Sequence, residues 1–406
     1  MIAACGQMQA NTIDEAAGVW AVVERLASEA AEGAADLFVL PEVTYPAYYL
    51  ESAERYRRPD IERSVAVRER FSTLAAKHHL WLVAGFVEED GDRLYNSAAV
   101  FDRSGGLVGV ARKNFLWDCD HEWFTAGEAL SVFDSEFGRM GVLICADARV
   151  PEIPATLVNG GAQFIVQPTA WVNTSGVRGT YRNIQPNLLI RARAMEFRVP
   201  FVCCSKAGRE GKVFEYVGQS QLVSGEGRVL AEAPMGGDNL IAAEITPGQP
   251  HTVAIDPARR ERLLNSAPPC RPARPGGACK VALRRSADAI AASLAAAGGR
   301  VARLTTQELD SFAPARCHAL DGVQVLLVRG RVGNDVLVRA RAAENRVFAI
   351  VAADTANLVI DPNGNIIWRQ SEWPDAIELD LGQADVKQFT PKTDLWAGRR
   401  VGCYRL

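Results

Sequence analysis

A strand that runs into a helix through a very short turn is the feature that most constrains this chain. Gly141 to Ile144 is an apolar run typical of the end of a buried strand, Cys145 follows at once, and Pro151 suits the first turn of a helix. A thiol at such a turn projects from a rigid element, and the backbone N–H groups of the turn favour its thiolate. Taken alone, a buried cysteine in this position is more commonly just a small apolar residue.

Strands and helices alternate over about the first 260 residues, with two hairpins inserted. This order predicts a layered α/β domain with its helices on the outside. The predicted strands and hairpins cover residues 2–10, 37–40, 81–85, 96–111, 163–167, 199–204 and 216–233, and the predicted helices cover 14–34, 60–79, 152–160 and 185–197.

The net charge of −3 provides no basic field, so we expect neither nucleic acid nor an anionic membrane surface as a partner. The N-terminus has no basic region before its short apolar run, and no apolar run approaches the length of a membrane span. Nine cysteines, an odd number that includes the adjacent pair Cys203-Cys204, argue against a disulfide framework. We therefore expect a cytoplasmic location, where thiols stay reduced.

A composition break divides the chain after its first 265 residues. Residues 266–279 hold four prolines and two glycines in fourteen positions, which is typical of a linker. We therefore expect a first domain over residues 1–265, the linker over 266–279 and a second domain over 280–406.

The second domain repeats part of the first in a shortened form. Leu337–Phe348 parallels Leu189–Phe201, and both stretches contain Arg-Ala-Arg-Ala. The turn over 361–367 likewise parallels the turn over 224–230. Agreement of this length indicates an internal repeat on the scale of a domain.

Two charged residues follow strands upstream of Cys145. Glu42 comes after an apolar strand and Pro41, where a partly desolvated carboxylate is suited to act as a general base. Lys113 ends the second strand of the 96–111 hairpin, where an ammonium could lie near a thiolate. Taken singly, each also fits a plain structural reading, as a loop carboxylate and a solvated strand-end charge.

Taken together, these motifs resemble the carbon–nitrogen hydrolase (nitrilase) superfamily over residues 1–265, in its amidase- and carbamoylase-like branch. The resemblance rests on Leu40-Pro41-Glu42, on Arg112-Lys113 followed by Glu122 and the run Trp123–Gly127, and on the whole stretch Gly141–Glu152. It implies an α-β-β-α sandwich, followed here by a degenerate second copy.

The resemblance also implies a Glu-Lys-Cys triad that works without a metal or cofactor. In this sequence Glu42 would be the base, and Cys145 would attack the substrate carbon to form a thioester. Lys113 would stabilise the oxyanion with the backbone N–H of Ala146, and Glu122 would hold Lys113 or the leaving group. A nearby ammonium lowers a thiol pKa, and preorganised donors stabilise an oxyanion, so the roles agree with the chemistry.

The turn sequence Cys-Ala-Asp-Ala-Arg resembles amidases and carbamoylases more than nitrile-cleaving members. Ala146 is small for its place and leaves room in the pocket. Arg149 could bind a substrate carboxylate or form a structural ion pair with Glu152, two readings of equal weight. Trp171 and Tyr48 follow strand ends and could line the pocket or belong to the core.

We therefore expect a thiol-dependent amidohydrolase acting on a small amide or N-carbamoyl compound. The alternatives are a nitrilase, an acyl transferase, or a binding or scaffold protein with a relic triad. The second domain has no counterpart of the triad motifs, since Cys317 and Cys403 lack the strand-Cys-Ala-Asp context. Its retained helix predicts either an internal pseudo-dimer or a homo-oligomer, because an apolar helix face must be buried.

Overall fold

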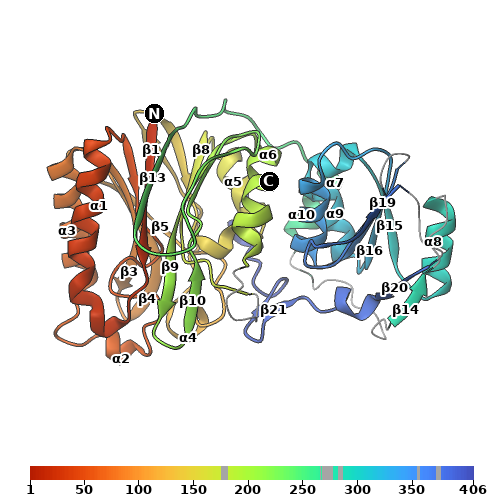
Figure 1. Cartoon of the computed structure of the whole chain (residues 1–406), viewed down its shortest axis with the longest axis horizontal. Coiled ribbons are helices and arrows are strands. Elements are labelled where there is room, and N and C mark those ends of the chain that lie inside the picture. The colour runs from red at the N-terminus through yellow and green to blue at the C-terminus, as the bar shows by residue number, and fades with distance from the viewer. Residues whose placement is uncertain (175–181, 266, 268–277, 282–286, 354–356, 372–375) are drawn as a thin grey trace. The chain divides into compact units, whose positions relative to one another are not determined.

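The computed structural model describes the chain except for residues 175–181, 266, 268–277, 282–286, 354–356 and 372–375. It divides into unit 1, residues 1–253 with 403–406, and unit 2, residues 254–402 (Figure 1). Of the predicted linker 266–279, only 267, 278 and 279 lie among the described residues. No helix among the described residues is both long enough and apolar enough to cross a membrane.

Unit 1 is built on strands in two halves that are joined by one short pairing. In the first half, β1, β2 and β3 run parallel, and β4, β5 and β13 pair antiparallel with their neighbours. The bounds of these strands are β1 Ile2–Gln9, β2 Leu37–Val39, β3 Trp81–Asp90, β4 Arg93–Phe101, β5 Leu107–Arg112 and β13 Asn239–Glu244.

The second half has β7, β8 and β9 parallel, with antiparallel strands at its margins. It meets the first half where β9 pairs with β1 at Met8 and Gln9. The bounds are β6 Val132–Ser135, β7 Gly138–Val142, β8 Phe164–Thr169, β9 Phe201–Glu210, β10 Phe214–Val217, β11 Gln221–Val223 and β12 Val229–Glu232.

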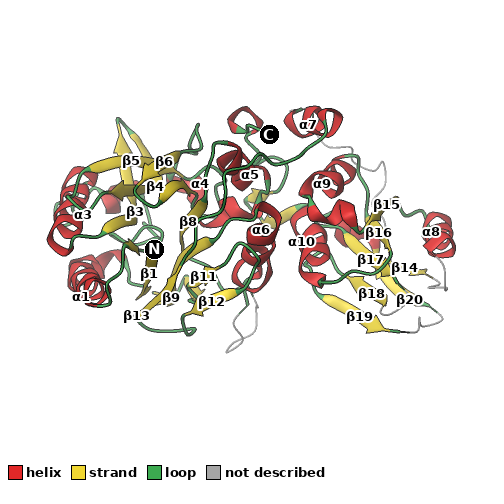
Figure 2. Ribbon diagram, turned by 90° about the horizontal axis from the view of Figure 1, so that it is seen from above, coloured by secondary structure: helices red, strands yellow, loops and turns green. Residues whose placement is uncertain are grey.

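Two pairs of helices cover the outer faces of these strands. Figures 1 and 2 show α1 (Val19–Glu32) and α3 (Ser64–His78) on one side, and α5 (Glu152–Asn159) and α6 (Ile190–Phe197) on the other. In α1 the buried residues recur every three or four positions, which is why this stretch packs as an amphipathic helix. The helices therefore lie outside the strands, and the predicted layered α/β arrangement is confirmed.

The parallel strands of both halves end where the loops carry reactive side chains. The segment of Glu42 follows β2, and the turn of Cys145 follows β7. The carboxyl ends of parallel strands are where α/β proteins assemble sites. The fold thus places reactive side chains that are far apart in the sequence, Glu42 and Cys145, at the carboxyl ends of parallel strands.

Unit 2 is a smaller α/β unit with its own hydrophobic core. Among the described residues its sheet has the order β15-β16-β17-β18-β19, the first three strands being parallel. These strands are β15 Val301–Thr305, β16 Val325–Arg329, β17 Phe348–Ala352, β18 Asn357–Ile360 and β19 Ile366–Gln370.

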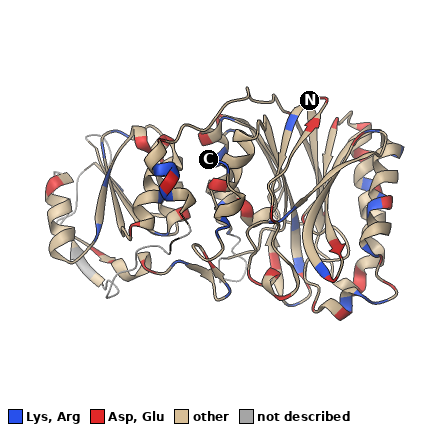
Figure 3. Ribbon diagram, turned by 180° about the vertical axis from the view of Figure 1, so that it is seen from behind, with Lys and Arg blue, Asp and Glu red and all other residues tan. Residues whose placement is uncertain are grey.

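Four helices and two small antiparallel pairs complete the described part of unit 2. The helices are α7 Pro257–Leu264, α8 Ala287–Ala296, α9 Phe312–Leu320 and α10 Asp335–Asn345, and the pairs are β14 Ala278–Val281 with β20 Ile377–Asp380 and β21 Gln388–Thr390 with β22 Thr393–Asp394. Figure 3 shows acidic and basic residues mixed along both units, in keeping with the small net charge.

The helices α6 and α10 make matching contacts within their own units. In each, the second arginine of Arg-Ala-Arg-Ala donates from Nε to a backbone oxygen and pairs with the glutamate three residues on. The contacts are Arg193 to Ala148 at 3.1 Å and to Glu196 at 3.0 Å, and Arg341 to Leu309 at 3.2 Å and to Glu344 at 2.8 Å. These contacts agree with the predicted repeat, but a degenerate second copy of the whole domain stays a prediction.

Gly85 in β3 lets the strand touch the segment that carries Glu42. Its N–H donates to Pro41 O at 3.2 Å, and its carbonyl accepts from Thr44 N at 2.8 Å. A Cβ at Gly85 would lie 2.6 Å from Val43 N and 2.7 Å from the Cα of Glu42. A side chain here would therefore displace backbone rather than a flexible side chain.

We predict that Gly85→Ala lowers the free energy of unfolding by about 1–3 kcal/mol, because the added methyl overpacks this contact. Urea unfolding followed by circular dichroism measures the change. Gly18→Ala is the control, since φ is −77° there and no atom lies within 4 Å of its Cβ position. A Gly85→Ala midpoint equal to that of the wild type would refute the close contact.

Candidate active site

Cys145 lies at the sharp turn between β7 and α5. Its φ is +46°, in the left-handed region that residues other than glycine rarely adopt, and it opens the 3-10 turn Cys145–Arg149. Its carbonyl accepts from Gln167 Nε2 at 2.8 Å, which helps to hold this backbone. The residue is 7% exposed. The thiol is thus presented by a rigid, nearly closed turn.

Asp147 fixes this turn to the segment that follows Lys113. Its Oδ1 accepts from the backbone N–H groups of Asn114 at 3.0 Å and Phe115 at 2.6 Å. Its Oδ2 accepts from Ile144 N at 2.9 Å. Burial raises the pKa of Asp147 to about 7, and the backbone N–H groups and Lys113 oppose that rise. The sequence analysis did not identify this role, because it used Asp147 only as part of the turn sequence.

The Lys113 ammonium lies between two buried carboxylates. Nζ is 2.6 Å from Glu42 Oε1 and 2.6 Å from Asp120 Oδ2, and all three side chains are fully buried. Glu42 Oε1 also accepts from Asn96 Nδ2 at 2.7 Å. Burial alone would lower the pKa of Lys113, but the charges of Asp120 and Glu42 raise it well above its ordinary value. Lys113 is therefore a fixed positive charge.

Glu42 keeps one oxygen without a partner. Oε2 is buried and has no hydrogen-bond partner among the described residues, whereas Oε1 is held by Lys113 and Asn96. Burial raises the pKa of Glu42, and the Lys113 charge opposes the rise. A carboxylate with a raised pKa and a free oxygen is suited to take up a proton.

The Cys145 thiol is protonated at rest. Burial raises its pKa to about 12, and the Glu42 charge raises it further, while Lys113, the side chain of Thr169 and the backbone N–H of Ala170 oppose the rise. A thiol of this kind becomes a nucleophile only when a base removes its proton. The carboxylate whose charge acts on this thiol is that of Glu42.

The structure brings Glu42, Lys113 and Cys145 together with two of the predicted pocket residues, Tyr48 and Ala146. The ring of Tyr48 lies 5.7 Å from Lys113 Nζ and is 2% exposed. Ala146 is buried directly after Cys145.

The other two predicted pocket residues have structural contacts. The Arg149 guanidinium stacks over the Trp117 ring at 4.3 Å. Trp171 is wholly buried, and its backbone N donates to Ser205 Oγ at 3.3 Å.

The second carboxylate that contacts Lys113, besides Glu42, belongs to Asp120. The expectation that Glu122 holds this lysine therefore needs correction. Both residues belong to the short helix α4 (Asp120–Trp123), but Asp120 faces the interior and Glu122 is exposed. Oδ2 of Asp120 also accepts from Trp117 N at 2.8 Å, which orients the carboxylate. Two acids on one helical turn differ only in the side they face, and the sequence alone does not distinguish them.

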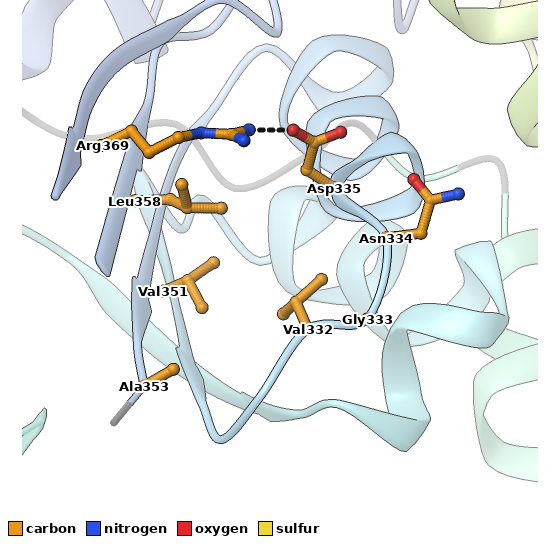
Figure 4. A pocket seen from close by; sticks show the side chains of 8 residues that line it. All are labelled: Val332, Gly333, Asn334, Asp335, Val351, Ala353, Leu358 and Arg369. Carbon is orange, nitrogen blue, oxygen red and sulfur yellow. Dashed lines mark hydrogen bonds and ion pairs between the residues drawn. The ribbon is translucent and has the colours of Figure 1, made fainter. Parts of the chain in front are cut away.

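A pocket lies in unit 2, before α10 and against strands β17 to β19 (Figure 4). Eight residues line it: Val332, Gly333, Asn334, Asp335, Val351, Ala353, Leu358 and Arg369. None of them carries a thiol or a hydroxyl, and the one carboxylate, Asp335, is paired with Arg369. The lining of this pocket therefore has no counterpart of the Glu42, Lys113 and Cys145 side chains of unit 1. Across the described residues, no group of three or more His, Cys, Asp or Glu is placed to hold a metal ion.

Comparison with known proteins agrees with the family resemblance found in the sequence. Residues 2–253 match the family model described as carbon-nitrogen hydrolase. Omega-amidase NIT2-B of Xenopus laevis is 32% identical over 231 residues, which are 54% of this chain and 80% of that protein. Omega-amidase NIT3 of Saccharomyces cerevisiae is 30% identical over 224 residues, which are 52% of this chain and 75% of that protein.

A solved amidase from Nesterenkonia sp. has the same fold. The two structures superpose with a TM-score of 0.54 at 22% identity, over 64% of this chain and 95% of the amidase. The predicted α/β fold of this class is thereby confirmed.

We predict that Cys145 carries no thiolate at neutral pH. With a pKa of about 12, its thiolate fraction grows only as the pH rises toward that value. The measurement is the far-ultraviolet thiolate absorbance of the wild type minus that of Cys145→Ala, followed from about pH 6 to about pH 10. We expect no difference over this range. A difference already present near neutral pH would contradict the prediction and indicate a stable thiolate–ammonium pair.

Proposed function

Because the chain belongs to the carbon–nitrogen hydrolase family, we propose that it is a thiol-dependent amidohydrolase of small amide or N-carbamoyl compounds. The observation that carries this proposal is the buried Glu42–Lys113 pair, 2.6 Å between charged atoms, beside the thiol of Cys145. The omega-amidases among its relatives support an amide over a nitrile. The bond cleaved is a C–N bond other than a peptide bond.

In the first half of the proposed reaction, Glu42 Oε2 takes the proton of Cys145 as the sulfur attacks the amide carbon. The C=O pair moves onto oxygen and gives a tetrahedral oxyanion. When this collapses, the C–N bond breaks, the nitrogen takes the proton from Glu42, and the amine or ammonia leaves. A thioester remains on Cys145, and Glu42 is again ionised.

The second half returns the enzyme to its starting state. Glu42 takes a proton from a water molecule, whose oxygen attacks the thioester carbon. The C–S bond then breaks, and the proton on Glu42 passes to the departing sulfur. The products are a carboxylic acid and the free thiol. One carboxylate thus acts as base and acid in each half.

Lys113 has the donor needed for the oxyanion. An ammonium has three N–H bonds, and Glu42 and Asp120 engage two of them. We assign the third to the oxyanion, together with the backbone N–H of Ala146. Each such donor contributes about 3 kcal/mol to transition-state stabilisation. Asp120 acts as a positioning residue that keeps the ammonium in place.

We predict that an amide substrate leaves an acyl group on Cys145, detectable by intact mass and peptide mapping. Glu42→Gln lowers kcat/KM by about 10²–10⁴-fold, because general acid–base catalysis is lost. Ammonia release measures the rate. Cys403→Ala, which removes a thiol in the C-terminal segment, is the control and keeps wild-type activity. An acyl group on another cysteine, such as Cys119, would refute the proposal.

We predict that Asp120→Asn lowers kcat by about 10²-fold, because the Lys113 ammonium loses one of its two anchoring charges. Glu122→Gln is the matched control on the same helix, and its kcat stays within about threefold of the wild type. Thermal unfolding of both variants checks that they fold. The opposite order, with Glu122→Gln the more damaging, would restore Glu122 as the residue that holds Lys113.

A further inference from the structure

The pocket of unit 2 lies at the carboxyl ends of β16 and β17, which are parallel neighbours. Residues 332–335 lead from β16 into α10, and Val351 and Ala353 lie at the end of β17. Unit 1 has the same order of strand, helix and strand in β8, α6 and β9, and the end of β8 lies next to the Cys145 thiol. Because α/β proteins bind ligands at this edge of their sheets, the pocket is a candidate binding site.

One wall of the pocket is a row of side chains on three adjacent strands. Val351 of β17 pairs with Leu358 of β18, and Leu358 pairs with Arg369 of β19. Residues directly opposite each other in neighbouring strands point to the same face of the sheet. The row therefore passes from two buried apolar side chains to a guanidinium, as Figure 4 shows. This wall is apolar at one end and charged at the other.

The segment before α10 forms the opposite wall and has the same polarity. Val332 lies at the Val351 end of the pocket, whereas Asp335 lies at the Arg369 end (Figure 4). The Asn334 side chain accepts at 2.9 Å from the backbone N–H two residues on, which fixes the backbone of this wall. The cavity has a volume of about 290 Å³, near the lower end of the range of about 300–1,000 Å³ that is usual for small-molecule sites.

Arg369 and Asp335 form the charged end of the pocket. Nη2 of Arg369 donates to Oδ2 of Asp335, and the described contact between the two side chains is this single hydrogen bond. Their side chains are 53% and 25% exposed, and an ion pair that is open to water contributes little to stability. A ligand that offers an opposite charge to each partner can therefore replace the pair at little cost.

We propose that unit 2 binds a free α-amino acid with an aliphatic side chain in this pocket. The carboxylate of the ligand pairs with Arg369, and its ammonium pairs with Asp335. Its side chain packs against Val332, Val351 and Leu358. A head group of one sign would meet a like charge here, whereas a zwitterion complements both residues. This site goes beyond the proposed amidohydrolase function and does not depend on it.

The test is calorimetry on the full chain with leucine and with two analogues that each lack one of its charges. Isocaproate has no ammonium, and isoamylamine has no carboxylate. We expect leucine to bind with a saturable heat, and each analogue to bind about tenfold more weakly or worse, because one charged residue of the pocket then stays without its ligand partner. Glycine, which lacks the aliphatic side chain, also binds more weakly than leucine.

Variants of the charged end place the binding in unit 2. Arg369→Met and Asp335→Asn each weaken leucine binding about tenfold or more, because each removes one of the two charges that the zwitterion pairs with. Arg331→Met, which removes a nearby exposed arginine that does not line the pocket, is the matched control and binds leucine like the wild type. Circular dichroism checks that the variants fold. The proposal is overturned if the wild type does not bind leucine, if leucine and isocaproate bind equally, or if binding survives Arg369→Met in a folded protein.

Discussion

The site depends on one ammonium that is held between two carboxylates away from water. Placing three charges in the interior is costly, and only close pairing offsets that cost. Lys113, Glu42 and Asp120 come from three different segments, after β5, after β2 and at the start of α4. Because burying any one of these charges without the others is costly, the three segments must pack together in the folded protein. The same pairing raises the pKa of Lys113 and leaves one oxygen of Glu42 unpaired.

Backbone contacts determine where the charges meet. Asp147 ties the turn of Cys145 to the chain after Lys113 by accepting from two of its N–H groups, and a third bond from Ile144 N closes the turn itself. Gly85 brings β3 against the Glu42 segment with two backbone hydrogen bonds and no side chain between them. The side chains that carry the chemistry thus have little freedom to move, and such preorganisation is what stabilises developing charge in a transition state.

The sequence predicted the strand-end residues and missed those whose role depends on orientation. Glu42, Lys113 and Cys145 each follow an apolar strand, so the pattern located them, and their resemblance to a known family named their roles. Asp120 and Glu122 lie two residues apart on one turn of helix, and only the packing of α4 decides which is buried. Asp147 has no periodic signal either, because its importance lies in contacts between segments far apart in the chain.

The two buried lysines, Lys113 and Lys206, differ in how many of their N–H groups have partners. Lys113 has two permanent partners and one remaining N–H, so it interacts most strongly with the negative charge that appears only in the transition state. The Nζ of Lys206 has no hydrogen-bond partner among the described residues, so no neighbouring charge holds it in one position. An interaction that is stronger in the transition state than in the ground state raises kcat, and only the Lys113 ammonium has the fixed geometry for it. Two lysines that are equally buried thus differ in function because only one of them is anchored by neighbouring carboxylates.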